Sequence, residues 1–147
     1  MSLKERIQEN VKEAMRSRDK KRLETLRMLT AAIKQVEVDE RIQVDEPRLL
    51  TILDKLIKQR KESISQFQAA GRDDLLAQEQ FELELLSQYL PEPLSTQAIE
   101  ALINETLNNL GAEKMADMGK VMAKLKPLLL GRADLASVSA LVKAKLS

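Results

Sequence analysis

Apolar residues recur at steps of three and four along almost the whole chain, which is the spacing of one face of an α-helix. Clear examples are Leu50, Leu53 and Ile57, and Met118, Val121, Met122 and Leu125. No stretch shows the strict alternation of a half-buried β-strand. Only four glycines and four prolines interrupt the 147 residues, and the abundant leucine, lysine, glutamate and alanine favour helices. The sequence therefore predicts an all-α protein.

Four helices are expected before Leu90. Their starts are marked by Ser2 with Glu5, by Asp19, by Asp45 with Pro47, and by Asp73 or Asp74. The helical pattern breaks between Val38 and Glu46, and Gly71 suits the end of the third helix. On that helix, Arg60 is expected to lay its stem along the core and keep its charged head in water. Residues 1–90 are thus predicted to form a four-helix N-terminal domain.

Pro91 and Pro93 stiffen the chain after the fourth helix, and we place a linker at residues 91–94. Residues 95–147 are predicted to form a three-helix C-terminal tail domain, so that the whole chain makes two helical bundles. Ser95 and Gly111 mark the start and end of the first helix of this domain. Pro127 should end or kink the second helix. Gly131 and Asp134 mark the turn and the cap before the third helix.

The last 34 residues carry seven basic and two acidic side chains, a net charge of +5, in a chain whose net charge is +1. A local basic field on a nearly neutral chain is typical of an anion-binding face. The residues that we assign to this face are Lys120, Lys124, Lys126, Arg132, Lys143 and Lys145. A second group of basic residues lies between Arg16 and Arg27, where acidic residues are interspersed. We interpret it mainly as a solvated surface, with a contact to a partner as the alternative.

The chain contains no histidine and no cysteine, which removes the commonest general base, thiol nucleophiles and the commonest metal ligands. The sequence around Lys120 also lacks the upstream glycine of a P-loop. We therefore expect no catalytic residue, no cofactor and no metal site. No apolar run approaches the about 18 residues of a membrane span. The N-terminus is charged, unlike a secretory signal, and we expect a cytoplasmic protein of undefined oligomeric state.

Two short motifs resemble the tail signature of the GatB/YqeY family. They are Met118-Gly119-Lys120-Val121-Met122 and Gly131-Arg132-Ala133-Asp134. The N-terminal part is similar to the free-standing members at Leu26-Arg27-Met28-Leu29, Lys61-Glu62-Ser63, Ala70-Gly71-Arg72-Asp73-Asp74 and Tyr89-Leu90-Pro91. The resemblance covers essentially the whole chain. Two positions depart from the family pattern: Leu130 stands where lysine is frequent, and Ala123 where glycine is common.

The resemblance implies a direction for function. The family includes the tail of the B subunit of tRNA-dependent amidotransferases, which helps to hold the tRNA while a separate catalytic domain activates the substrate. This chain resembles the tail and has no match to the catalytic domain. By this resemblance Lys120, Arg132, Lys143 and Lys145 belong to a basic helical face, Gly119 permits close approach, and Asp134 is a helix cap.

Three functions follow as hypotheses. The first is a non-catalytic helical module that binds tRNA or another structured RNA through the basic C-terminal face. The second is a protein-interaction module that docks a larger enzyme through the leucine-rich fourth helix or the tail. The third is that the chain is itself an enzyme of glutamine-dependent carbon–nitrogen ligation, or is accessory to such amidotransferase activity; the lack of histidine, cysteine and a nucleotide-binding loop argues against catalysis by this chain. The first is favoured because lysines and arginines on adjoining helices can neutralise phosphates.

Overall fold

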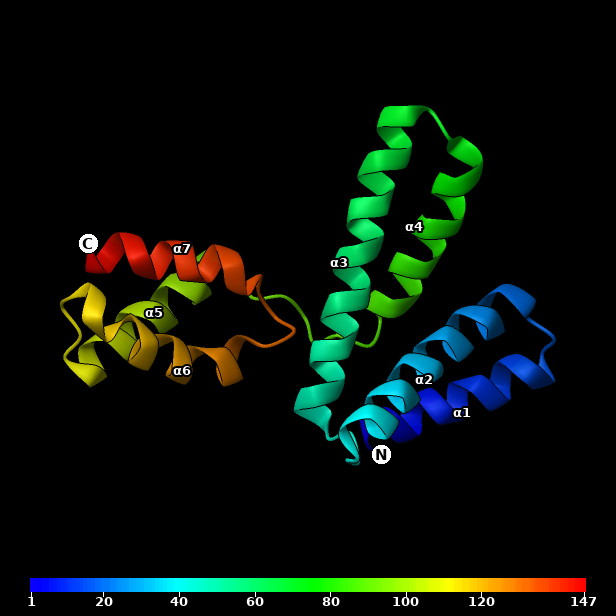
Figure 1. The fold of residues 1–147 in the computed structure, drawn as a ribbon, viewed down its shortest axis with the longest axis horizontal. Coiled ribbons are helices and arrows are strands. Elements are labelled where there is room, and N and C mark those ends of the chain that lie inside the picture. Colours follow the sequence, from blue (N-terminus) through cyan, green and yellow to red (C-terminus); the bar gives the residue numbers. More distant parts are fainter. The chain divides into compact units, whose positions relative to one another are not determined.

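The computed structural model describes all residues from 1 to 147 and contains seven α-helices, one short 3-10 helix and no strand (Figure 1). The prediction of an all-α protein is confirmed. The chain divides into two compact units, Met1–Leu90 and Pro91–Ser147, which we call unit 1 and unit 2 and describe separately. No helix is long and apolar enough to cross a membrane.

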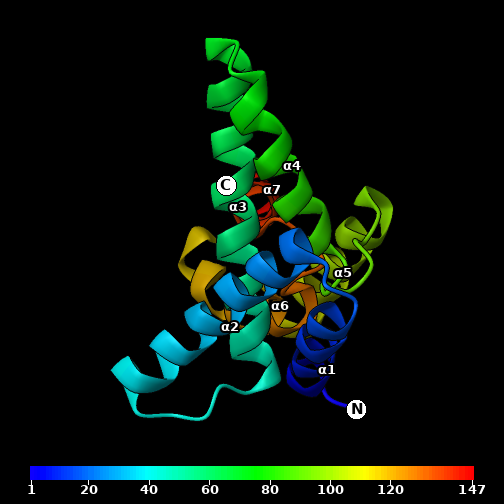
Figure 2. The same ribbon diagram turned by 90° about the vertical axis from the view of Figure 1, so that its right-hand side faces the viewer.

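Unit 1 consists of two helical hairpins. Helix α1 (Leu3–Arg16) lies beside α2 (Lys20–Glu40), and α3 (Glu46–Ala70) lies beside α4 (Asp73–Ser87) (Figures 1 and 2). The hairpins share one apolar core, whose fully covered members include Ile7, Leu26, Leu29, Leu53 and Leu86. Burying these large aliphatic side chains supplies most of the stability of a unit with few aromatic residues.

Most of the predicted helix starts are confirmed. The Ser2 hydroxyl accepts a hydrogen bond from the Glu5 N–H at 3.2 Å, and Asp45 accepts one from the Arg48 N–H at 2.9 Å. The start of α4 is a correction, because Arg72 occupies the N-cap and neither neighbouring aspartate caps the helix. Asp73 and Asp74 lie in the first turn instead, where carboxylates are favoured by the helix dipole.

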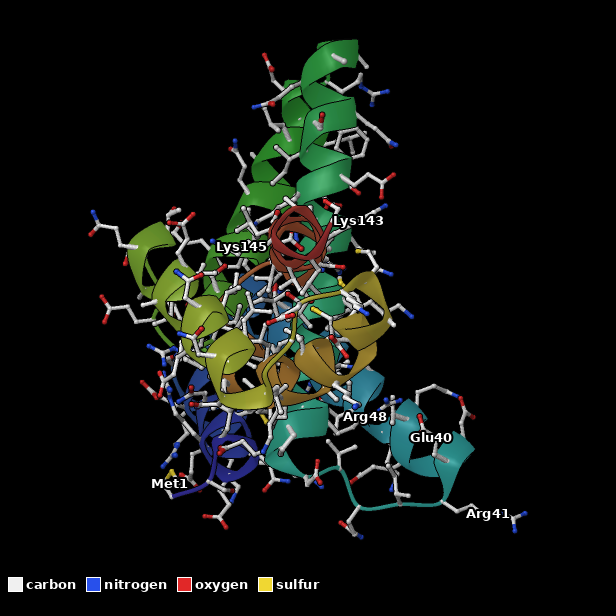
Figure 3. All side chains as sticks on the ribbon, turned by 90° about the vertical axis from the view of Figure 1, so that its left-hand side faces the viewer. Met1, Glu40, Arg41, Arg48, Lys143 and Lys145 are labelled. Atoms are coloured by element: carbon white, nitrogen blue, oxygen red, sulfur yellow. The ribbon has the colours of Figure 1, made fainter.

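Two further expectations for unit 1 are corrected. Helix α2 continues through Val38 to Glu40 and ends at Arg41, whose φ of 54° is left-handed. Glu40 forms an ion pair with Arg48 across the connection to α3 (Figure 3), which holds this turn together. Arg60 does not keep its head in water: its Nε donates to Glu82 Oε2 at 3.2 Å, and both side chains are mostly buried.

Unit 2 consists of α5 (Thr96–Leu110), the 3-10 turn η1 (Met115–Asp117), α6 (Met118–Leu129) and α7 (Leu135–Leu146) (Figure 1). Its own core is formed by Ile103, Val121, Leu125, Leu129, Val138, Val142 and Leu146. These residues come from the apolar stripes of the three helices, so one small bundle covers all of them.

The turn between α6 and α7 differs from expectation at Pro127. The helix does not end there but continues to Leu129, with Pro127 inside its last turn, where the missing N–H removes one internal hydrogen bond. Gly131 then adopts a φ of 76°, and Asp134 caps α7 by accepting from the Ala136 N–H at 3.2 Å. Both of these predictions are confirmed.

Candidate nucleic-acid interface

Lys120 and Lys124 form a pair on the solvent side of α6. They are four residues apart, which places them about 40° apart around the helix axis and one turn apart along it. Both side chains are exposed, whereas the neighbouring Val121 and Leu125 are completely buried. The apolar stripe of α6 therefore faces the core of unit 2, and this pair of ammonium groups faces solvent.

The other lysine of α6 does not belong to this pair. Lys126 is two residues beyond Lys124, so the two side chains lie about 160° apart around the axis. Lys126 also lies in the last turn of α6, where a cation is favoured by the negative end of the helix dipole. Its position is thus explained by helix stability, and it does not extend the surface formed by Lys120 and Lys124.

Lys143 and Lys145 lie on opposite sides of the last turn of α7. Figure 3, which looks along this helix, shows the two side chains on either side of it. Their spacing of two residues again corresponds to about 160° around the axis. Both are exposed and flank the buried Val142 and Leu146.

One N–H of the Arg132 guanidinium is engaged within unit 2. Its Nε donates to the carbonyl oxygen of Glu92 at 3.2 Å, and its own carbonyl accepts from the Leu94 N–H at 2.9 Å. Arg132 is half-buried, and Leu94 packs against the core of unit 2. The residue therefore joins the α6–α7 turn to the segment that precedes α5, instead of projecting into solvent as the lysines do.

Most of these cations gather at one end of unit 2. Helices α6 and α7 lie side by side, and α7 contacts η1, so the start of α6 and the end of α7 share an end (Figure 1). We call this the basic end of unit 2: Lys114 and Lys120 lie at the start of α6, Lys143 and Lys145 at the end of α7, and Lys124 lies one turn further along α6 from Lys120. Lys126 and Arg132 lie toward the α6–α7 turn at the opposite end.

Asp117 organises the η1 turn at the basic end. Its Oδ2 accepts from the backbone N–H groups of Glu113 at 3.2 Å and Lys114 at 3.3 Å. These two hydrogen bonds, with the charges of Lys120 and Lys114, hold the pKa of the Asp117 carboxyl below its ordinary value. The carboxylate is therefore engaged by its own turn. None of the five lysines of the basic end forms an ion pair.

Sequence reasoning missed Lys114, which belongs to the same end although it lies outside both family motifs. The sequence could have identified Lys114, because this lysine contributes to the positive net charge of the last 34 residues.

The motif residue Gly119 is exposed, and a Cβ built on it would meet nothing within 4 Å. No part of this chain needs the glycine for close packing.

The comparison with protein families agrees with the motifs. Residues 4–146 match one family, described as Yqey-like protein, and the match includes both units and the basic end.

The chain belongs to the YqeY-like family.

The resemblance to the GatB/YqeY family is thereby confirmed over nearly the whole YqeY-like chain. Its relatives include the protein called Altered inheritance of mitochondria protein 41, mitochondrial, from several organisms. The Eremothecium gossypii relative is 40% identical over 85 residues, which cover 57% of this chain and 46% of the relative. The Vanderwaltozyma polyspora relative is 36% identical over 107 residues, which cover 71% and 58%. The Saccharomyces cerevisiae relative is 32% identical over 123 residues, which cover 79% and 66%.

The matched part of this YqeY-like chain thus spans between 46% and 66% of the length of these relatives. All three carry the word mitochondrial in their names. Those names describe a location and a phenotype of inheritance, and they state no reaction or ligand.

Proposed function

We propose that this YqeY-like chain is a helical RNA-associated module without catalysis of its own, and that the basic end of unit 2 contacts the phosphates of a folded RNA. The observation that carries the proposal is that all five lysines of the basic end are exposed and without an ion pair. An unpaired lysine loses no protein partner when it approaches a phosphate, and the release of counterions from the RNA favours binding.

The composition favours recognition of shape over recognition of bases. The chain has two phenylalanines and one tyrosine, and Tyr89 is buried with its hydroxyl donating to Asn10 at 2.6 Å. Unit 2 contains no aromatic residue. Stacking of unpaired bases on aromatic rings is therefore unavailable at the basic end, and contacts to the backbone of a structured RNA fit it better.

Family membership supports tRNA as the first RNA to test. The resemblance to the amidotransferase tail implies a tRNA-holding role, and it also implies an accessory link to carbon–nitrogen ligation. In this proposal the chain contributes RNA binding to such a reaction, and any activation chemistry belongs to a separate catalytic domain.

The test compares tRNA binding by the full chain and by three charge-reversed variants. The double variant Lys120→Glu with Lys124→Glu reverses both charges of the lysine pair on α6. We expect it to weaken tRNA binding by about tenfold or more at low salt. Lys126→Glu is the control and is compared with Lys120→Glu alone as well as with the double variant, because each single variant reverses one lysine of α6 but on a different side. Equal losses in the control and the double variant, or no loss in the double variant, would contradict the proposal.

The protein-docking hypothesis now points to a different surface of unit 1. Leu86 is completely buried and Leu85 is 7% exposed, so these leucines belong to the core. Leu75 near the start of α4 is 38% exposed and is not a member of the core that α3 and α4 share with α1 and α2. The hairpin of α3 and α4 extends beyond α1 and α2 at its connecting turn (Figure 2). A protein partner retained in high salt and lost in Leu75→Asp would favour docking over RNA binding.

A further inference from the structure

A row of cations runs along the outer side of α2 in unit 1. Lys20, Arg27 and Lys34 are each seven residues apart, so they lie within about 40° of one another around the helix axis. The row is about 21 Å long, with a cation about every 10 Å. All three side chains are exposed, and none forms an ion pair.

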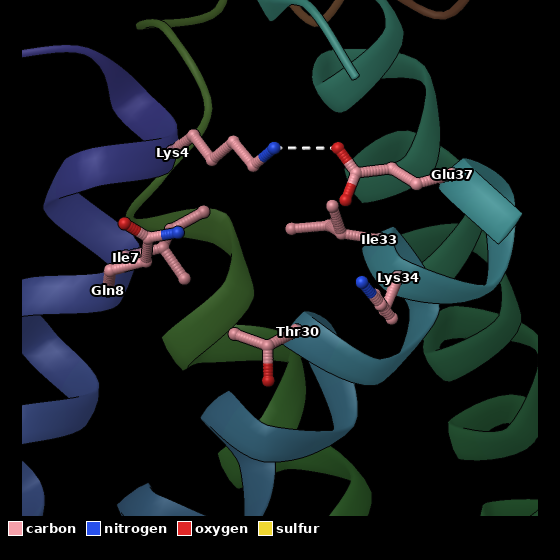
Figure 4. Close-up of a pocket in the computed structure, with 7 residues that line it drawn as sticks. All are labelled: Lys4, Ile7, Gln8, Thr30, Ile33, Lys34 and Glu37. Atoms are coloured by element: carbon pink, nitrogen blue, oxygen red, sulfur yellow. Dashed lines mark hydrogen bonds and ion pairs between the residues drawn. The ribbon is translucent and has the colours of Figure 1, made fainter. Parts of the chain in front are cut away.

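The neighbouring helix adds to the same face. Lys4 and Gln8 of α1 line a hollow of about 240 Å³ together with Thr30, Lys34 and Glu37 of α2, above a floor of Ile7 and Ile33. Figure 4 shows the Lys34 side chain directed toward this hollow, with Lys4 and Glu37 paired across its far edge. Lys12 follows Gln8 one turn further along α1 and lies about 80° around the axis from Lys4. We call this surface the α1–α2 basic face.

Other cations of this region are used by the fold. Arg22 lies 3.8 Å from Glu13, and the Lys21 ammonium lies 5.6 Å from the centre of the Phe81 ring. These contacts join α2 to α1 and α4, so the two residues are not available to a partner. The basic run in the sequence therefore separates into cations that contact α1 or α4 and a row whose side chains form no ion pair, although Lys34 lies near enough to Glu37 to favour its ionised form.

The acidic side chains near the face leave most of its charge uncompensated. Glu37 is neutralised by Lys4 Nζ at 2.6 Å and also accepts from the Val44 N–H at 2.9 Å. Glu9 pairs with Lys12 at 3.5 Å. Glu24 lies about 40° from Lys20 and about 60° from Arg27 around α2, so it borders the row and offsets part of its charge. The row itself contains no acidic residue. Lys20 lies in the first turn of α2, where the helix dipole disfavours a cation, so the helix does not stabilise its charge.

We propose that the α1–α2 basic face binds the phosphate backbone of structured RNA, as a second contact separate from the basic end of unit 2. A single small anion would engage only one cation of a row this long. A polyanion with closely spaced phosphates can place one opposite each of Lys20, Arg27 and Lys34 and release counterions at each. No aromatic ring lies free beside the row, so the face contacts the backbone and not unpaired bases.

The inference goes beyond the proposed function, and neither surface requires the other to bind. The experiment measures affinity for a fluorescent RNA hairpin with a double-stranded stem, by anisotropy, using the full chain. Arg27→Glu with Lys34→Glu is the test variant. Lys55→Glu with Lys61→Glu is the matched control, because both lysines are exposed on α3 and the net charge changes equally. Circular dichroism establishes that each variant is folded. If the charge-reversed pair does not fold, the neutral pair Arg27→Gln with Lys34→Gln replaces it as the test variant.

We expect the test variant to lose about tenfold in affinity and the control to lose far less. The neutral pair Arg27→Gln with Lys34→Gln should also lower the slope of log affinity against log salt concentration, by the amount that corresponds to about two lost phosphate contacts. A test variant that binds as the wild type, or a control that loses as much, would overturn the inference.

Two further comparisons separate the possible outcomes. If Lys120→Glu with Lys124→Glu retains wild-type affinity while the test variant loses it, the proposed role of unit 2 fails and the α1–α2 basic face stands. Binding of vesicles containing phosphatidylserine is measured in parallel. Vesicle binding that depends on Arg27 and Lys34, without any effect of these residues on RNA binding, would assign the face to a membrane surface and overturn the inference.

Discussion

The Arg132 guanidinium donates from Nε to the carbonyl oxygen of Glu92 at 3.2 Å, across 40 residues of sequence. This contact, with the Leu94 N–H to Arg132 carbonyl hydrogen bond at 2.9 Å, fixes the segment before α5 to the α6–α7 turn. The arginine of the family motif thus has a structural task within unit 2.

We predict that Arg132→Ala lowers the free energy of unfolding by about 1 kcal/mol, the usual net value of one such hydrogen bond. Urea titration followed by circular dichroism measures this. RNA affinity should change much less in Arg132→Ala than in Lys120→Glu with Lys124→Glu. A variant with unchanged stability and lost RNA binding would show that Arg132 contacts RNA directly.

Replacing different leucines of α4 by alanine should lower the stability by very different amounts. Leu86 is completely buried, so Leu86→Ala should cost about 2–5 kcal/mol through lost burial and the cavity that remains. Leu75 is 38% exposed, and Leu75→Ala should cost less than about 1 kcal/mol. Thermal or urea unfolding of the two variants provides the comparison. Similar costs at both positions would contradict the described packing of α4.

Gly119 offers a test that separates stability from binding. Because a Cβ at this position meets nothing within 4 Å and the residue lies in α6, Gly119→Ala should raise the unfolding free energy by about 0.5–1 kcal/mol. If an RNA backbone approaches closely at Gly119, the same variant should bind tRNA more weakly although it is more stable. Lower stability in Gly119→Ala would show that the glycine serves the fold.

Glu37 should make the stability of unit 1 depend on pH. The hydrogen bond from Lys4, followed by that from Val44, holds the pKa of Glu37 below its ordinary value of 4.5. The ionised form is favoured in the folded state, so this stabilisation is complete above pH 4.5 and is lost as the pH falls through the lowered pKa.

Glu37→Gln should therefore be less stable than the wild type at neutral pH, and the two should converge as the pH falls through the lowered pKa of Glu37. Urea titrations at neutral pH and over a series of acidic pH values measure the difference. A difference that stays the same at low pH would show that the Glu37 charge contributes nothing to stability.

Local patterns in the sequence predict much of this fold. The apolar spacing of Val138, Val142 and Leu146 identifies the buried side of α7, and Asp45 identifies the start of α3, because helix periodicity and capping act over a few residues. The Arg132–Glu92 contact and the Arg60–Glu82 pair depend on tertiary packing, which no local pattern reveals.

The candidate site was predicted only in part for a related reason. Net charge identifies the basic C-terminal segment, but it does not show that Lys124 and Lys126 lie on different sides of α6. The helical angle between residues would have separated them from sequence alone. The same calculation applied at a spacing of seven residues would have identified the row of Lys20, Arg27 and Lys34, which the dense basic run around it concealed.

The most direct test of the central claim is the salt dependence of tRNA binding by the wild-type chain and by Lys120→Gln with Lys124→Gln. We predict that the wild-type affinity falls steeply as salt rises, and that the neutralised pair shows both weaker binding and a slope smaller by about two charge contacts. Binding that does not depend on salt, or an identical slope in the two proteins, would contradict an RNA interface at the basic end of unit 2.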